Sequence, residues 1–166
     1  MKRGAWAKSL AIRFIGSVSE NIARLTSWAT LSAIRECGDS VTLRSGVVIK
    51  SPEGLNLGSR VLINHNSLLN AKGGIAIGSD VVIGFGTIIS TSEHNGPTYF
   101  SNSRHRPIVI GSNVWIGAGV IVNPGSSIGS NVIIGSGAVV NGDIPDGVIA
   151  VGVPAKPVRT SDQLSQ

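Results

Sequence analysis

The sequence predicts an all-β fold, a parallel β-helix of about five coils stacked into a three-sided prism. From residue 110 onward an aliphatic side chain recurs at every sixth position, a period that neither an α-helix nor a simple strand produces. Such hexads align in three columns, as expected when three short strands complete one coil. Gly occurs 22 times and aromatic residues make up only 4% of the chain, which favours repetitive β structure over a helical core.

The aliphatic positions define the register of the predicted coils. They are Ile110, Ile116, Val122, Ile128, Ile134 and Val140, preceded by Ile77, Ile83 and Ile89 and by Leu57, Ile63 and Leu69. The first column of hexads contains LGSRVL, IGSDVV, IGSNVW and IGSNVI, the second INHNSL, IGFGTI, IGAGVI and IGSGAV, and the third LNAKGG, ISTSEH, VNPGSS and VNGDIP. We expect the aliphatic residue to point inward and the Gly or Asn after it to turn the corner with a positive φ. Coils spaced by about 4.8 Å would then form a prism about 24 Å long.

Two segments depart from the repeat. Between Ile89 and Ile110 the period is interrupted, and residues 92–107 are predicted to protrude as a loop, which in compact domains is usually functional. In residues 1–36, apolar side chains recur at helical spacing, at Leu10, Phe14, Val18, Ile22, Leu25 and Ala29. We therefore expect a helical N-terminal segment, a β-helix domain over residues 37–160 and a tail over residues 161–166.

The N-terminal segment has two open interpretations. It can cap the first coil, or its basic side chains can contact an anionic membrane surface. Lys8 and Arg13 interrupt the apolar stretch, so we expect no signal peptide, and no run of 18 apolar residues predicts a spanning helix. The expected location is the cytoplasm, with peripheral contact at the inner face of the membrane as an extension of the second interpretation.

Charge and cysteine content exclude some functions. The net charge is +5, but the basic residues are not interleaved with aromatic ones, so we expect no nucleic-acid partner. The single cysteine, Cys37, rules out an intramolecular disulfide and a cysteine-based metal site.

Four motifs resemble the hexapeptide-repeat acetyltransferase family, in the branch of galactoside, maltose, xenobiotic and polysaccharide O-acetyltransferases. They are INHN at 63–66, ISTSEHN at 89–95, IGSNVWIGAG at 110–119 and GDIPDGVIAVGVPAKPVR at 142–159. The resemblance implies a left-handed winding, which the spacing does not predict because most β crossovers are right-handed. It also implies acetyl-CoA as co-substrate, no metal, and a homotrimer with sites between two prisms.

The resemblance further implies the catalytic residues. His94 matches the family's general base, which would take the proton of a sugar hydroxyl as that hydroxyl attacks the thioester. Glu93 is not its obvious partner, since neighbouring side chains on a strand face opposite ways, and a backbone carbonyl is an equal candidate. Asn64 matches an asparagine that lines the acceptor site. Its alternative role is that of a corner residue, as for Asn123 and Asn141 in other hexads.

The cofactor residues come from the same resemblance. Gly117, Ala118 and Ser136 match positions whose backbone amides bind the pantetheine arm, and Lys156 and Arg159 match a basic pair that meets CoA phosphates. Trp115 matches a tryptophan beside the site, with simple packing as its alternative. Asn141 and Gly142 stand where close relatives often have Thr-Lys, so a phosphate or adenine contact can be missing.

These residues predict an O-acetyltransferase that acts on a sugar hydroxyl, with a cell-surface polysaccharide or lipid-linked glycan as the favoured acceptor. The alternatives are a small-molecule or xenobiotic acceptor, a sugar N-acyltransferase, and a non-catalytic assembly module. A serine acetyltransferase normally has a longer N-terminal domain than 36 residues. A zinc-dependent γ-type carbonic anhydrase also uses this kind of prism, but His65, His94 and His105 do not have the spacing of its ligands.

Overall fold

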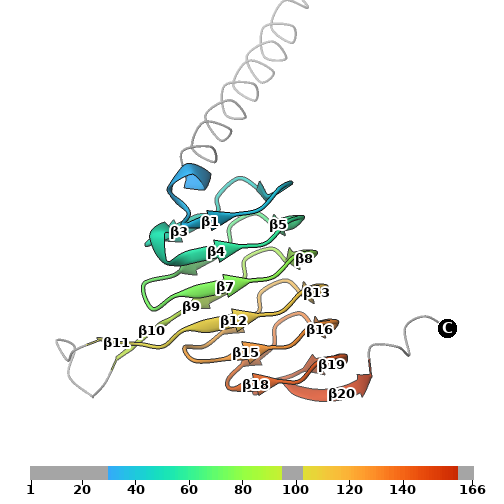
Figure 1. The fold of residues 1–166 in the computed structure, drawn as a ribbon. Coiled ribbons are helices and arrows are strands. Elements are labelled where there is room, and N and C mark those ends of the chain that lie inside the picture. Colours follow the sequence, from blue (N-terminus) through green and yellow to red (C-terminus); the bar gives the residue numbers. More distant parts are fainter. Residues whose placement is uncertain (1–29, 95–102, 161–166) are drawn as a thin grey trace, which may run out of the picture.

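The computed structural model describes residues 30–94 and 103–160, and it is a parallel β-helix whose coils stack into a prism (Figure 1). Sheet A contains β1 (Glu36–Cys37), β4 (Leu55–Leu57), β7 (Ile75–Ile77), β12 (Ile108–Ile110), β15 (Ser127–Ile128) and β18 (Asp143–Ile144). Sheet B contains β2 (Thr42–Leu43), β5 (Val61–Ile63), β8 (Val81–Ile83), β13 (Val114–Ile116), β16 (Val132–Ile134), β19 (Val148–Val151) and β20 (Lys156–Thr160). Sheet C contains β3 (Val48–Lys50), β6 (Leu68–Asn70), β9 (Ile88–Ser90), β14 (Ile121–Val122) and β17 (Val139–Val140).

The predicted columns are confirmed by the strand register. Leu57, Ile77, Ile110 and Ile128 pair in sequence along sheet A, so each aliphatic residue lies over its counterpart in the next coil. The same holds for Ile63 onward in sheet B and Leu69 onward in sheet C. These side chains are buried, and their files form the core. Each coil depends on its neighbours for that burial, which fixes the register.

The corners turn differently from our expectation. The glycine that follows the inward aliphatic residue, such as Gly58, does not have a positive φ. A Cβ on Gly58 would lie 2.6 Å from the carbonyl carbon of Gly78 in the next coil, so glycine is required there for close approach. The positive φ falls two positions later, at Arg60, Asp80 and their counterparts Asn113 and Asn131.

Three corners join the sheets, and each is named here by the sheets it connects. The AB corner comprises residues 38–41, 58–60, 78–80, 111–113 and 129–131. The BC corner comprises residues 44–47, 64–67, 84–87, 117–120 and 135–138. The described residues of the CA corner are 51–54, 71–74, 91–94, 103–107, 123–126 and 141–142. It includes a short 3₁₀ helix, η1 (Pro52–Gly54).

The interruption of the repeat occurs at the CA corner. β10 (Ser92–His94) and β11 (Ser103–His105) pair antiparallel, and together they leave the stack of coils (Figure 1). The predicted protruding loop thus begins as a two-stranded hairpin, and Tyr99 and Phe100 lie outside the described residues.

The N-terminal prediction falls mostly outside the described part of the chain. Residues 30–33 are helical and β1 begins at Glu36, while residues 1–29 and the tail over 161–166 are not described. Within the described ranges, no helix combines the length and apolar character needed to cross a bilayer.

Candidate active site

The predicted site residues lie on two different corners of the prism. His94 is at the end of β10, in the hairpin of the CA corner. Asn64 lies on the BC corner, in the loop between β5 and β6. Gly117, Ala118 and Ser136 lie on the same BC corner, two and three coils further along the stack. One copy of the chain therefore does not bring the predicted base next to the predicted cofactor positions.

His94 is presented to solvent by the hairpin. Its side chain is exposed, and Ser103 is its partner across the two strands. Glu93 instead pairs with Arg106, with Oε1 3.1 Å from Nε, and the Arg106 Nη2 donates to Oε2 at 3.2 Å. Glu93 is thus bound to Arg106, in agreement with the expectation that its side chain and that of His94 face opposite ways. None of the described residues makes a hydrogen bond to the His94 ring.

The base of the hairpin is held by a chain of hydrogen bonds. Asn70 Nδ2 donates to Ser92 Oγ at 3.0 Å, and the same oxygen lies 2.8 Å from Nδ1 of His105. The backbone amide of Gly73 donates to Thr91 Oγ1 at 2.8 Å. These contacts tie both strands to the preceding coil, so His94 projects from a fixed support rather than from a free loop.

One file of residues on the BC corner has backbone amides without partners. It occupies the third hexad position and contains Ser45, His65, Phe85, Ala118 and Ser136. In the described part of the chain, no hydrogen bond is made by the amides of Phe85, Ala118 or Ser136. Successive coils lie about 4.8 Å apart, so the file offers donors at regular intervals along one edge.

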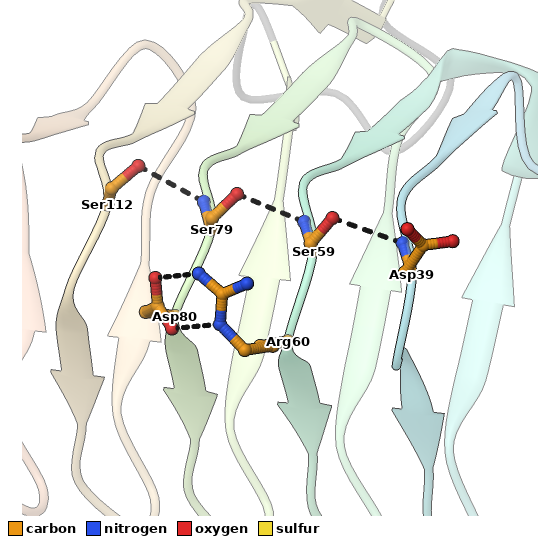
Figure 2. A network of polar contacts seen from close by, with 6 residues as sticks. All are labelled: Asp39, Ser59, Arg60, Ser79, Asp80 and Ser112. Carbon is orange, nitrogen blue, oxygen red and sulfur yellow. Dashed lines mark hydrogen bonds and ion pairs between the residues drawn. The ribbon is translucent and has the colours of Figure 1, made fainter.

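The equivalent file on the AB corner is closed by serine hydroxyls. Asp39 donates its amide to Ser59 Oγ at 3.1 Å, Ser59 to Ser79 at 3.0 Å and Ser79 to Ser112 at 3.1 Å (Figure 2). The amide of Ser112 continues the ladder by donating to Ser130 Oγ at 3.1 Å. The open amides are therefore a property of the BC corner and not of the coil geometry in general.

Gly117 differs from its two predicted companions. Its amide already donates to the carbonyl of Ile134 at 2.8 Å, so this group is not available to a ligand. A Cβ at this position would lie 2.6 Å from the amide nitrogen of Ser136. The structure thus requires a glycine here for coil stacking, whereas Ala118 and Ser136 present free amides.

Asn64 acts as a corner residue and keeps one polar atom free. Its backbone amide and its Nδ2 both donate to the carbonyl of Ile83, each at 3.0 Å. No described residue donates to its Oδ1. The structure is therefore compatible with both interpretations of Asn64. Its Nδ2 links two coils, while its Oδ1 can accept a hydrogen bond from a hydroxyl group.

The remaining predicted cofactor residues lie on sheet B. Trp115 points outward from β13 and is 57% exposed, so it is not simply packed in the core. Lys156 and Arg159 are exposed on β20, which pairs antiparallel with β19 and ends the sheet. All three thus lie on the face that borders the BC corner.

Other reactive groups do not gather into a second centre. His65 lies on the BC corner, with Nδ1 2.7 Å from Ser45 Oγ, whereas His94 and His105 lie on the CA hairpin. Residues 30–94 and 103–160 contain no group of three side chains that could hold a metal ion. Partial burial raises the pKa of the Cys37 thiol, which disfavours the nucleophilic thiolate.

Two features of the site were missed at the sequence level. The free amide of Phe85 belongs to the same file as Ala118 and Ser136, and aligning the second-column hexads at their third position would have found it. The Glu93 and Arg106 pair depends on the antiparallel register of the hairpin, for which the six-residue period carries no signal.

Comparison with known proteins identifies the family. Residues 107–142 match the family described as bacterial transferase hexapeptide (six repeats). The galactoside O-acetyltransferase of Escherichia coli (strain K12) is 33% identical over 130 residues, which cover 74% of this chain and 62% of that protein's length. The putative colanic acid biosynthesis acetyltransferase WcaF of the same organism is 31% identical over 122 residues, covering 74% of this chain and 67% of the relative.

A solved structure has the same architecture. The galactoside acetyltransferase in complex with coenzyme A superposes with a TM-score of 0.76 at 29% identity, over 82% of this chain and 70% of that one. The left-handed winding expected from the resemblance agrees with this likeness. The chain therefore belongs to the bacterial hexapeptide-repeat transferase family and has its left-handed parallel β-helix fold.

Proposed function

We propose that this protein is an acetyl-CoA-dependent O-acetyltransferase that acts on a sugar hydroxyl, with His94 as the general base. The observation that carries the proposal is the file of unpaired amides at Phe85, Ala118 and Ser136 on the BC corner. Pantetheine contains two amide carbonyls separated by four bonds, about 5 Å when extended, which is close to the coil spacing of about 4.8 Å. Two successive amides of the file can therefore hold the two carbonyls of one pantetheine arm.

The split of the site between corners supports a homotrimer. Sheet C lies between the two corners concerned, and its outward residues form an apolar row. Its members are Val48, Leu68, Ile88, Ile121 and Val139. Val48 is 47% exposed and Ile88 42%, an apolar surface that favours a partner. Three prisms that turn sheet C toward a common axis bury this row and bring each CA corner against the BC corner of the next copy.

In this arrangement the reaction needs no covalent enzyme intermediate. The His94 imidazole of one copy takes the proton of the acceptor hydroxyl while that oxygen attacks the thioester carbonyl. CoA leaves as a thiolate and regains a proton from the imidazolium. Asn64 Oδ1 of the neighbouring copy accepts a hydrogen bond from an acceptor hydroxyl, and Lys156 and Arg159 meet the CoA phosphates. Trp115 contacts the cofactor from sheet B.

The acceptor and the location are extensions of this proposal. WcaF is named for colanic acid biosynthesis and the galactoside enzyme for a sugar acceptor, which supports a glycan acceptor here. Our favoured acceptor is a cell-surface polysaccharide or its lipid-linked precursor. We expect the reaction to take place in the cytoplasm. Contact of residues 1–36 with the inner face of the membrane stays a prediction, because residues 1–29 are not described.

The test is acetyl-CoA turnover over a panel of sugars, amino sugars and glycan fragments, with wild type and His94→Ala side by side. We expect the variant to lose about 10²–10⁴-fold in kcat at unchanged thermal stability. Unchanged turnover in His94→Ala would remove the mechanism. Absence of turnover with every acceptor in the wild type would favour the assembly-module alternative, and transfer to amino sugars alone would favour the N-acyltransferase.

Mixed oligomers test the shared site separately. Copies with His94→Ala are expected to be inactive, and copies with Ala118→Leu to have little activity when acetyl-CoA is held well below its KM, but co-expressed and co-purified they should be more active than either alone. About a quarter of the junctions in a random ring would combine an intact base with an intact corner. If both sets of residues instead acted within one copy, mixing would recover nothing.

A further inference from the structure

A groove lies on the outer face of sheet A, beside the CA corner and away from the proposed cofactor edge. Its volume is about 370 Å³. Its floor is formed by the outward residues Asn56, Ala76 and Val109, while the side chains of Ile75 and Ile108, which also line it, are buried in the core. Arg35, Lys72 and Pro107 line it as well.

Two cations face this groove without a counter-charge. Arg35 and Lys72 are exposed, and neither takes part in an ion pair or side-chain hydrogen bond within the described ranges. The acids that do form ion pairs, Asp80 and Glu93, are bound to other arginines. Glu36 stands beside Asn56 in the sheet register but does not pair with Arg35. Both charged residues that line the groove are therefore cations, which favours an anion.

Asn56 supplies a second and independent feature. Its Oδ1 is buried and has no hydrogen-bond partner among the described residues. A buried acceptor left unpaired is costly, and native proteins usually satisfy such atoms with a donor. A ligand hydroxyl is a suitable donor, and the aliphatic floor suits the C–H face of a sugar ring.

We propose that this groove binds an anionic monosaccharide unit, carrying a carboxylate or a phosphate, as part of the acceptor. Arg35 and Lys72 would bind the anion, and Asn56 a ring hydroxyl. The inference rests on the proposed function, since it names the class of glycan that is acetylated. Lys72 and Pro107 connect the groove to the hairpin, because Lys72 precedes Gly73, which contacts Thr91 and His105, and Pro107 follows β11. In the three-fold arrangement, sheet A is the wall that adjoins the His94 hairpin.

The experiment compares a neutral sugar with two of its anionic derivatives, one with a carboxylate at C6 and one with a phosphate at C1. Binding of glucose, glucuronate and glucose 1-phosphate to the full chain is measured by ligand-observed NMR, with coenzyme A present at saturation to occupy its own phosphate contacts. We expect both anions to bind about tenfold or more tightly than glucose, as for one desolvated charge-assisted contact. A preference for only one of them identifies the anion as carboxylate or phosphate.

Three groove variants and one control variant test whether the preference arises in the groove. Lys72→Gln and Arg35→Gln are each expected to reduce it by about tenfold, whereas Arg44→Gln, which removes an exposed cation from the BC corner, should leave it intact. Asn56→Leu should weaken binding of all three sugars while raising the melting temperature, which a purely structural asparagine would not do.

The outcomes separate the two proposals. Equal binding of glucose and the anions, or a preference that survives both Lys72→Gln and Arg35→Gln, would overturn the groove assignment. If the preference is present and depends on these cations but no sugar is acetylated, the groove stands and the proposed function fails.

Discussion

The AB and BC corners have the same backbone conformation, but they differ in whether their third-position amides are hydrogen-bonded. On the AB corner, serine hydroxyls close the amides at the third hexad position, and the side chains at the fourth position pair across coils. These pairs are Arg60 with Asp80 (Figure 2) and Asn113 with Asn131. On the BC corner, the fourth position is glycine in most coils and the third-position amides stay open. A repeat can therefore seal one corner with its own side chains and leave the other to a ligand.

The largest expected effect tests what the two corners share. Gly111 on the AB corner and Gly117 on the BC corner both lie against the next coil, with a Cβ 2.6 Å from Ser130 Oγ or the Ser136 amide nitrogen, respectively. Gly111→Ala and Gly117→Ala should each lower the free energy of unfolding by about 2–3 kcal/mol, because backbone must move. Chemical denaturation measures this loss. A cost at one corner only would show that the backbone plans differ.

The second prediction separates the corners by function. Ala118→Leu places a bulky side chain over the open amides and should raise the KM for acetyl-CoA by about tenfold or more, with little change in stability because residue 118 is exposed. Ser112→Leu is the matched substitution on the AB corner. It should lower stability, since Ser112 Oγ accepts the Ser79 amide, and leave the KM for acetyl-CoA unchanged. The reverse assignment of effects would place the cofactor on the AB corner.

The third prediction concerns single hydroxyl groups. Ser79→Ala removes the acceptor of the Ser59 amide and should cost about 1 kcal/mol in the free energy of unfolding. Ser136→Ala at the equivalent place on the BC corner should cost less than about 0.5 kcal/mol, because no described residue bonds its hydroxyl. Equal losses would mean that Ser136 closes a ladder of its own.

The contrast between the corners also marks what the sequence could predict. Only one strand register buries all the Ile, Val and Leu side chains of the files, so the alignment of hexads predicts the columns. The same alignment places His94 and Asn64 on separate corners. The positive φ was assigned to the wrong position, because glycine serves both close approach and left-handed backbone. The sheet A groove was missed, because it is lined by segments of the CA corner at Gly54, Lys72 and Pro107, where the chain does not follow the six-residue period.

The smallest expected effect is a pH dependence on the closed corner. The hydrogen bond from Arg60 holds the pKa of Asp80 below its usual value. A carboxyl with a lowered folded-state pKa contributes stability above its unfolded pKa, and this contribution is lost as the pH falls through the folded value. Asp80→Asn should therefore lower the melting temperature slightly at pH 7 and have no effect once the pH lies below the folded pKa.

The substitution isolates the charge from the turn. Asp80 has a φ of 61°, and asparagine already occupies the equivalent place at Asn113, with a φ of 55°, so the change adds no backbone strain. The pair is exposed, so high salt should screen most of the difference between wild type and variant. If the difference in melting temperature between wild type and Asp80→Asn persists unchanged in acid or in high salt, Asp80 stabilises the backbone of the corner and not the ion pair. The AB corner would then be closed by its serines alone.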